Sequence, residues 1–291
     1  KTFQEECREL FKGDGTPRFN PFFIPKMIAD IASGHISIQY GFRGPNFTTV
    51  SACASSTNAL IDSFIYIRLG KAYIIISGGS EATVHETGVG GFNALQALST
   101  RNDSPETASR PFDKDRDGFV LGEGSGALIL EELEHALKRG AKIYAEVVGG
   151  GLSADAYHMT APHPEGLGAR NVMRTALSEA GLTTADIDYI NVHGTSTPLG
   201  DVAELRGIKE VFGEHAFKMN ISSTKSMTGH LLGAAGAIEA IATILAVKND
   251  LVPPTINHFT DDPEIDPNFR LTFGKAEKRT VNAALSNTFG F

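Results

Sequence analysis

Apolar and polar positions along this chain of 291 residues alternate between short β-type runs and longer runs with helical spacing. Short apolar and β-branched runs predict strands at residues 48–50, 72–79, 126–130 and 189–192. Apolar residues at helical spacing predict helices at residues 60–69, 131–139, 172–180 and 231–247. Gly140 and Gly181 stand where two of these helices should end. Alternating strands and helices indicate a layered α/β fold.

Two segments repeat one local order: a short strand, a polar turn and a helix of small residues. They are residues 48–69 and residues 221–247. This internal repeat agrees with a fold built from two related halves. No linker or low-complexity stretch separates the halves in sequence, so we expect them to pack as one unit.

Cys53 lies in the first repeat, where the strand should pass into the helix. N–H groups of the first helical turn and the helix dipole favour a thiolate, which predicts a pKa below the free value of about 8.5. The small neighbouring residues leave room for a substrate. A buried structural cysteine at a packed turn would show the same pattern, so the assignment depends on other residues.

Two histidines lie far downstream in turns rich in Gly, Ser and Thr. His193 follows the strand-like residues 187–190, and His230 precedes the long apolar helix, with Lys225 five positions before it. A satisfied loop or core residue is the alternative for each histidine. One cysteine with two distant histidines is nevertheless typical of a nucleophilic enzyme, because folding brings together what the sequence separates.

Three motifs resemble the active-site signatures of the β-ketoacyl-acyl carrier protein synthases. They are Ser51-Ala52-Cys53-Ala54-Ser55-Ser56, His193-Gly194-Thr195-Ser196-Thr197 and Lys225-Ser226-Met227-Thr228-Gly229-His230. Within that family, residues 111–124 and 155–160 resemble the elongating type, synthase II of bacterial fatty acid synthesis. The likeness runs from about Asn20 to Phe291, and the order and spacing of the motifs make it specific.

The resemblance implies a thiolase-like, duplicated α/β/α/β/α layered fold. Residues 1–142 would be the N-terminal half with the nucleophile, and residues 143–291 the C-terminal half with both histidines. Relatives extend further at both ends. We therefore expect this chain to lack part of the N-terminal half and the extreme C-terminus of the fold.

The resemblance also implies the catalytic roles. Cys53 would accept an acyl chain from the phosphopantetheine arm of an acyl carrier protein. His193 and His230 would donate hydrogen bonds to the enolate formed when malonyl-acyl carrier protein loses carbon dioxide. Lys225 would hold charge near the site and pair with Glu239. The product would be an acyl chain two carbons longer, and no cofactor beyond the arriving phosphopantetheine is expected.

Substrate-binding residues are predicted in two groups. Thr195 and Thr197 lie two apart, so an extended segment would point both hydroxyls to one side, toward the amides of a pantetheine arm. By resemblance, Thr160 joins them, and the backbone N–H groups of Cys53 and Phe291 form an oxyanion hole. The candidates that line or gate an acyl pocket are Phe92, Phe289 and Phe291.

Composition restricts the partners and the location. The net charge of −8 argues against nucleic acid, and the two cysteines give no disulfide framework, which favours the cytoplasm. Residues 231–247 contain Glu239 and many small residues, which predicts an internal helix and no membrane span. Because acyl carrier proteins are acidic, docking needs a local basic patch, with candidates at Lys12, Arg18, Lys26, Arg43, Arg68, Lys71 and Arg101. Relatives are homodimers, so a homodimer is expected.

A metal site is not expected. Asp113-Lys114-Asp115-Arg116-Asp117-Gly118 resembles the first half of a calcium loop, but its twelfth residue is Gly124 where a glutamate is required. Other functions stay open: a CoA-dependent thiolase or initiating synthase, a polyketide ketosynthase, and a non-catalytic subunit like a chain-length factor. The second histidine argues against the first of these, and the intact cysteine motif against the last.

Overall fold

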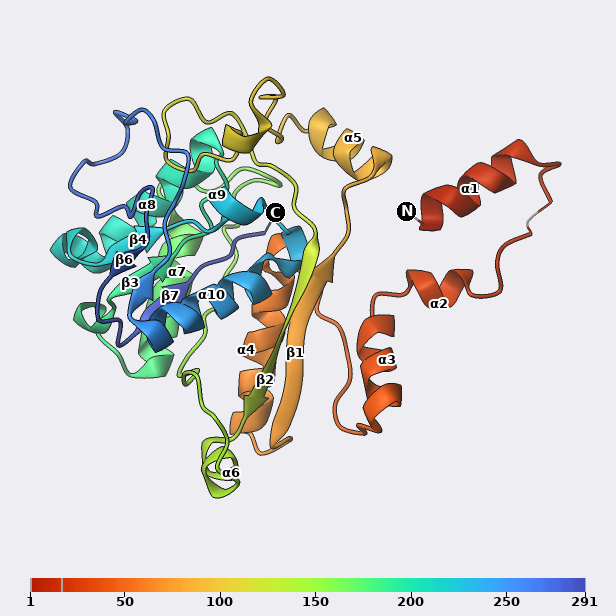
Figure 1. Cartoon of the computed structure of the whole chain (residues 1–291), viewed down its shortest axis with the longest axis horizontal. Coiled ribbons are helices and arrows are strands. Elements are labelled where there is room, and N and C mark those ends of the chain that lie inside the picture. Colours follow the sequence, from red (N-terminus) through yellow and green to blue (C-terminus); the bar gives the residue numbers. More distant parts are fainter. Residues whose placement is uncertain (1, 17, 291) are drawn as a thin grey trace.

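The structure, a computed structural model, describes residues 2–16 and 18–290 (Figure 1). Phe291, one of the predicted site residues, lies outside the described residues, as do Lys1 and Pro17. The helices are, in chain order, α1 (Thr2–Lys12), α2 (Phe23–Met27), α3 (Ile31–Tyr40), α4 (Ser55–Arg68), α5 (Glu86–Ala94), α6 (Leu133–Lys138), α7 (Leu167–Ala180), α8 (Pro198–Phe212), α9 (Lys225–Thr228) and α10 (Ala235–Asn249).

The strands of the described residues form three small sheets. In the first, β1 (Ile74–Glu81) pairs antiparallel with β2 (Gly124–Glu131). The second is parallel, in the order β4 (Asn220–Ser222), β3 (Tyr189–Asn191), β7 (Ala284–Ser286). In the third, β5 (Leu251–Val252) pairs antiparallel with β6 (Glu277–Lys278).

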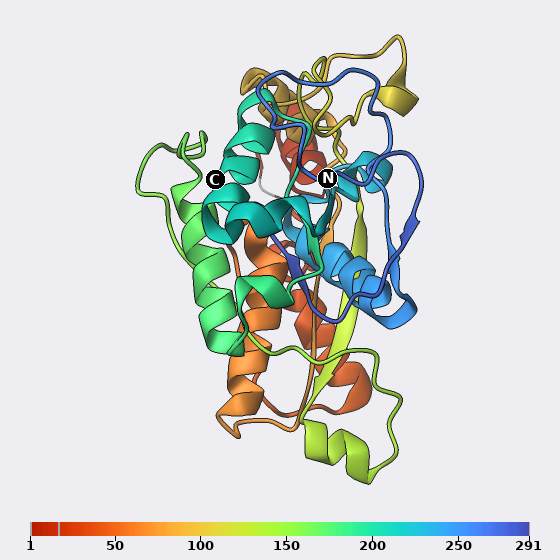
Figure 2. The same cartoon turned by 90° about the vertical axis from the view of Figure 1, so that its left-hand side faces the viewer.

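The parallel sheet lies in the main hydrophobic core. β3 and β4 are fully buried, as is usual for parallel strands covered on both faces. α7 and α8 pack against each other on this half, as the face in Figure 2 shows, and supply Met173 and Ile208 to the core around Ile190 and Ile221.

α4 and α10 lie side by side and both contact the β1–β2 ribbon. The helices approach closely: a Cβ on Gly236 would lie 2.0 Å from Thr57 Oγ1, and the N–H of Ala237 donates to Ser56 Oγ at 2.9 Å. Residues Leu232–Asn249 are long and apolar enough to cross a membrane, a property that core helices share. α10 contacts α4, β1, β2 and β7, which is the packing expected of an internal helix.

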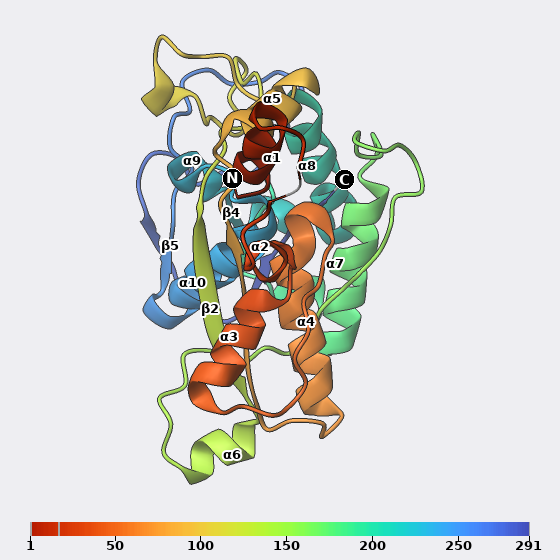
Figure 3. The ribbon, with the colours of Figure 1, turned by 90° about the vertical axis from the view of Figure 1, so that its right-hand side faces the viewer.

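α1, α2 and α3 form an arm at one side of the molecule (Figures 1 and 3). None of these three helices has a fully buried residue. An ion pair of 2.8 Å between Arg8 and Glu86 joins α1 to α5.

Most predicted elements are present with shifted ends, and one is wrong. β1, β2, β3, α4, α6, α7 and α10 confirm seven of them, and Gly181 ends α7 with φ +67°. Residues 48–50 are not a strand, because no strand of the described residues lies beside them to complete a ladder. The hydroxyl of Thr49 donates to the carbonyl of Ser55 at 2.8 Å instead.

Candidate active site

Cys53 lies in a 3-10 turn (Ala52–Ala54) that leads directly into α4. Ala52 has a left-handed backbone (φ +48°), which turns the chain sharply before Cys53. Ser55 Oγ fixes the turn by accepting the N–H of Ser51 at 2.9 Å and donating to the carbonyl of Ala52 at 2.7 Å. The turn therefore holds Cys53 at the start of a helix, as the sequence predicts.

Burial controls the ionisation of Cys53. Its side chain is 3% exposed and packs in a cluster with Phe119 and Leu232. Burial raises the pKa of the thiol to about 11, although the nearby Lys225 charge opposes this rise. The predicted lowering of the pKa is therefore wrong, because loss of water outweighs the opposing effects of the Lys225 charge and of a backbone hydrogen bond at Cys53. At neutral pH the group is a thiol, which must lose its proton as it reacts.

His230 is 2% exposed and lies between α9 and a second 3-10 turn (Leu232–Ala234). Its N–H donates to the carbonyl of Val120 at 2.7 Å, and its carbonyl accepts the N–H of Gly122 at 2.9 Å. The ring atom Nδ1 accepts the N–H of Leu232 at 3.3 Å. In the neutral ring the proton therefore lies on Nε2, which is free to donate to a substrate.

His193 follows β3 directly, and its ring stands 5.2 Å from that of His230, nearly perpendicular to it. Its buried Nδ1 has no hydrogen-bond partner among the described residues. Burial lowers the pKa of both histidines well below 6.5, and the charge of Lys225 lowers it further. Both rings are therefore neutral at physiological pH and can act as hydrogen-bond donors.

Lys225 begins α9 and is 1% exposed. Its ammonium group forms an ion pair with Glu239 of α10, the partner that the resemblance implies. Burial raises the pKa of Glu239 to about 7, and Lys225 opposes that rise. The pair brings a positive charge close enough to influence Cys53 and both histidines.

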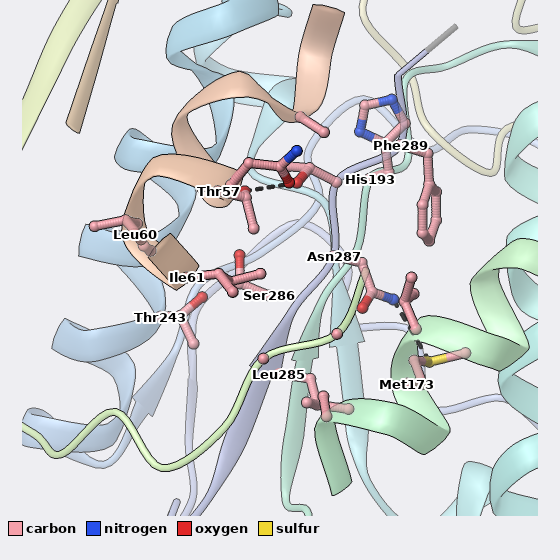
Figure 4. Close-up of a pocket in the computed structure, with 18 of the residues that line it drawn as sticks. Thr57, Leu60, Ile61, Met173, His193, Thr243, Leu285, Ser286, Asn287 and Phe289 are labelled. Carbon is pink, nitrogen blue, oxygen red and sulfur yellow. Dashed lines mark hydrogen bonds between the residues drawn. The ribbon is translucent and has the colours of Figure 1, made fainter. Parts of the chain in front are cut away.

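A cavity of about 2280 Å³ opens beside these groups, and Figure 4 shows part of it. Its lining includes His193, His230, Thr160, Thr195, Thr197 and Phe289. The hydroxyls of Thr195 and Thr197 lie 3.0 Å apart, so they share one side of their segment as predicted. Phe289 stands with its ring edge-on to His193 at 5.6 Å.

Of the other two predicted pocket residues, Thr160 lines the cavity and Phe92 does not. Thr160 is exposed on the loop that precedes α7, and its hydroxyl makes no contact with Thr195 or Thr197 that the structure records. Phe92 is not part of the cavity lining; it packs against Phe119, with ring centroids 5.4 Å apart, in the cluster that contains Cys53.

The backbone of residues 287–290 runs next to the turn that contains Cys53. A Cβ on Gly290 would lie 2.6 Å from the carbonyl oxygen of Ser51 and 3.2 Å from the N atom of Cys53. Thr288 Oγ1 donates to Thr57 Oγ1 at 2.6 Å, the contact drawn in Figure 4. Only glycine permits this approach, so residues 287–290 and the turn that contains Cys53 pack closely against each other.

Known proteins match this arrangement along almost the whole chain. The N-terminal domain of beta-ketoacyl synthases matches residues 2–136, and their C-terminal domain matches residues 144–259. The chain belongs to the beta-ketoacyl synthase family. It is 53% identical to 3-oxoacyl-[acyl-carrier-protein] synthase 2 of Synechocystis over 99% of its length and 68% of that protein. It is 51% identical to the mitochondrial synthase of Arabidopsis thaliana over 98% of its length and 62% of that protein.

Solved ketosynthases share its fold. A beta-ketoacyl synthase from Burkholderia phymatum is 38% identical, with a TM-score of 0.92 over 99% of this chain and 69% of the other. A type II PKS ketosynthase in complex with its acyl-carrier protein is 36% identical, with a TM-score of 0.94 over 100% and 72%. The thiolase-like ketosynthase fold is thus confirmed, and the chain spans about two thirds of the curated relatives that it matches.

Two residues of this synthase site were not predicted. Phe119 covers the site with its ring edge-on to His230 at 5.2 Å. Glu204 of α8 is buried and accepts the backbone N–H groups of His193 and Gly194 at 3.0 and 2.9 Å, with Asn287 Nδ2 at 3.1 Å. In the sequence, Glu204 could have been noticed as an acidic residue between the apolar Ala203 and Leu205. The structure shows that both of these neighbours are buried.

No group of three metal-binding side chains occurs in residues 2–16 and 18–290. Asp113, the first residue of the loop that resembles a calcium site, accepts the N–H groups of Asp115, Phe259 and Thr260 at 2.6 to 2.9 Å. Its carboxylate is therefore already used to join two loops.

Proposed function

We propose that this protein is a condensing enzyme that elongates acyl chains on acyl carrier protein by two carbons. The observation that carries the proposal is the convergence of one buried cysteine and two neutral histidines. Both histidines line the cavity, as do Ser51 and Ala54 of the segment that contains the cysteine. Cys53 and His230 both pack against Phe119, and the rings of His230 and His193 lie 5.2 Å apart.

The first half-reaction is acyl transfer to Cys53. Its sulfur attacks the thioester carbonyl, the new S–C bond forms, and the bond to the pantetheine sulfur breaks. The proton of the thiol is transferred to the departing pantetheine sulfur, since a thiol with a pKa of about 11 is almost entirely protonated at neutral pH. The negative oxygen of the intermediate would accept the backbone N–H of Cys53 and, by family resemblance, that of Phe291; such donors each contribute roughly 3 kcal/mol.

The second half-reaction begins when malonyl-acyl carrier protein loses carbon dioxide. The electron pair of the broken C–C bond moves into an enolate, whose oxygen accepts hydrogen bonds from His193 and from Nε2 of His230. Because both rings are neutral, they stabilise the enolate without protonating its carbon. The carbanion then attacks the carbonyl carbon of the Cys53 thioester, so that a new C–C bond forms and the bond from that carbon to the Cys53 sulfur breaks. The released thiolate takes up a proton to restore the thiol, and the extended 3-oxoacyl chain leaves on the carrier protein.

Both carrier-protein forms are the proposed partners, and we place the enzyme in the cytoplasm as a homodimer without a cofactor of its own. The names of its relatives support the carrier protein, and the ketosynthase of a related complex is bound to one. A polyketide role is less favoured, because identity to the synthases named 3-oxoacyl-[acyl-carrier-protein] synthase 2 reaches 53%, against 36% for the type II PKS ketosynthase.

The decisive experiment is the intact mass of the natural full-length protein after incubation with a long-chain acyl carrier protein. A mass gain equal to the acyl group, absent in Cys53→Ala, is expected. Malonyl-acyl carrier protein should then remove the label and release the 3-oxoacyl product. Labelling by acyl-CoA but not by acyl carrier protein in a folded protein would contradict the proposed donor.

A further inference from the structure

Arg116 is a buried cation outside the catalytic group, and its guanidinium faces the segment that follows the His193 motif. Its Nε donates to the carbonyl of Thr197 at 3.1 Å, and its second terminal nitrogen donates to the carbonyl of Pro198 at 2.8 Å. The remaining nitrogen donates to the carbonyl of Asp113 at 2.8 Å. The Arg116 side chain therefore connects the loop around Asp113 to the start of α8 through hydrogen bonds.

Two carboxylates complete this contact. Arg116 forms ion pairs with Asp201 at 3.4 Å and with Asp262 at 2.5 Å. Asp201 is fully buried, whereas the side chain of Asp262 retains 11% exposure. The group therefore contains one positive and two negative side chains, and almost no water reaches it.

Asp201 also stabilises two unusual backbone conformations. One of its oxygens accepts the N–H of Ser196 at 3.1 Å, and the other accepts the N–H of Phe112 at 2.9 Å. Ser196 and Phe112 both have φ +69°, a left-handed conformation that a bulky residue such as Phe112 rarely adopts. Such conformations persist where the surroundings impose them, and they concentrate at functional sites.

The strained Ser196 lies between Thr195 and Thr197, whose hydroxyls face the cavity 3.0 Å apart. Its carbonyl accepts the N–H of Gly118, the residue before Phe119, at 3.0 Å. The orientation of both threonines therefore depends on the segment that Arg116 and Asp201 hold in place.

We propose that Arg116 is a positioning residue that sets the two threonine hydroxyls for the amides of a pantetheine arm. The inference rests on the proposed function, since it assumes a pantetheine-borne acyl donor. Arg116 itself does not touch the substrate; it acts through the carbonyls of Thr197 and Pro198 and through Asp201.

Arg116→Lys separates geometry from charge. Lysine keeps the positive charge beside Asp201 and Asp262. Its single ammonium group cannot donate to all three carbonyls that the planar guanidinium group of Arg116 contacts. Arg110→Lys is the matched control. Arg110 is equally buried and pairs with Asp113, but among the described residues its side-chain hydrogen bonds go to Thr107 alone.

The measurement is the rate of Cys53 acylation in the natural full-length protein, with two donors of the same acyl chain. One donor is the acyl-pantetheine, and the other is the thioester of ethanethiol, which has no amide. The ratio of their kcat/KM values reports how well the protein binds the amides. We expect Arg116→Lys to lower this ratio roughly three- to tenfold, through a higher KM for acyl-pantetheine, as one or two misplaced hydrogen bonds would.

The ethanethiol donor should react with Arg116→Lys at the rate of the natural protein, and Arg110→Lys should keep the natural ratio even if it melts at lower temperature. Thr197→Val, which removes one of the two hydroxyls, should lower the ratio directly. An unchanged ratio in folded Arg116→Lys would overturn the proposal, because Arg116 would then serve stability alone.

If Arg116→Lys does not fold, Asp262→Asn provides the test, since it weakens the hold on the guanidinium from its more accessible side. A two- to threefold lower ratio is expected there, and the natural ratio would overturn the proposal. A natural protein that acylates Cys53 without preferring the amide donor would also overturn it while leaving the proposed function intact. Absence of acylation by every donor, including acyl carrier protein, would instead contradict the proposed function.

Discussion

The turn that carries Cys53 and the turn after His230 have the same backbone but different chemistry. Each is a 3-10 turn, Ala52–Ala54 or Leu232–Ala234, and each leads straight into a long helix. The first residue of each has a left-handed conformation, with φ +48° at Ala52 and φ +45° at Leu232. At the second position, the first turn has Cys53 and the second has Gly233.

The two turns therefore have the same backbone geometry but different roles. The first presents a side chain, the Cys53 thiol. In the second, Gly233 has no side chain to present, and its N–H donates to Glu81 at 3.2 Å. The residues to which we assign a catalytic role at this turn, His230 and Lys225, precede it in the sequence. A repeated fold can therefore supply two halves of one site when side chains differ at a few equivalent positions.

The largest expected effect comes from Lys225→Ala, because only the second turn depends on a buried ion pair. The substitution leaves Glu239 buried without its partner, which typically costs about 3–5 kcal/mol of unfolding free energy. The pKa of Glu239, already raised to about 7 by burial, should rise further without Lys225. A raised carboxyl pKa favours the protonated folded state, so stability falls as pH rises from the ordinary value of 4.5. Urea unfolding should therefore show a larger deficit at pH 8 than at pH 5.

The control for this prediction is the double variant Lys225→Met with Glu239→Leu, which removes both charges. It should recover most of the unfolding free energy, while malonyl decarboxylation remains impaired because the positive charge is absent. A deficit below 1 kcal/mol in Lys225→Ala, or normal decarboxylation in either variant, would contradict the role given to the pair.

The second prediction compares the first residues of the two turns. Leu232→Gly relieves a left-handed conformation but removes a side chain that packs against Cys53 and Phe119, so we expect a loss of about 2–4 kcal/mol. Ala52 is exposed, so Ala52→Gly relieves the strain with little lost packing and should change the unfolding free energy by less than about 1 kcal/mol. Calorimetry of both variants checks this difference. If both variants lost the same free energy of unfolding, the backbone strain at Ala52 would differ from the strain at Leu232.

The sequence predicted the elements whose signal is local. The apolar spacing in α4 and α10 and the glycine that ends α7 depend on few neighbours, so they could be recognised before the fold was known. The cysteine and histidine motifs were recognisable because the family uses the same residues in the same order.

Features that depend on tertiary surroundings could not be predicted in the same way. Residues 48–50 have strand propensity, but a strand needs a partner that no local pattern supplies. The pKa of Cys53 is raised where the sequence predicted a lowered value, because burial under Phe119 and Leu232 outweighs the influences that favour the thiolate. The buried acid Glu204 and the fork of Arg116 act on segments far away in sequence, so no spacing rule pointed to them.

The third prediction concerns the crossing of the helices that follow the two turns. Gly236→Ala would place a Cβ 2.0 Å from Thr57 Oγ1 and 2.8 Å from its backbone N, so overpacking should cost about 1–3 kcal/mol. Gly90→Ala is the matched control, because Gly90 is a helical glycine in α5 with no atom within 4 Å of its added Cβ. Thermal melting should show Gly90→Ala unchanged or up to about 1 kcal/mol more stable. A Gly236→Ala variant as stable as the control would show that the two helices separate without cost.

The smallest expected effect is on the pH dependence of decarboxylation. This prediction compares the ionisation of the histidines with that of Cys53 at the first turn. A lowered histidine pKa means that protonation begins only well below pH 6.5. Both rings should therefore stay neutral between pH 8 and pH 6. Carbon dioxide release from malonyl-acyl carrier protein should be constant over that range. An acid limb centred near 6.5 would contradict this prediction, because it would mean that at least one ring is hydrated and titrates as a free histidine.

Alkylation of Cys53 by iodoacetamide in the same buffers provides the contrast. With a pKa of about 11, the reactive thiolate remains a small fraction that grows roughly tenfold for each pH unit between 6 and 9. The labelling rate should follow that slope, whereas decarboxylation stays constant. A labelling rate that levels off below pH 9 would place the thiol pKa near its free value, and the helix N-terminus would then outweigh burial at the first turn.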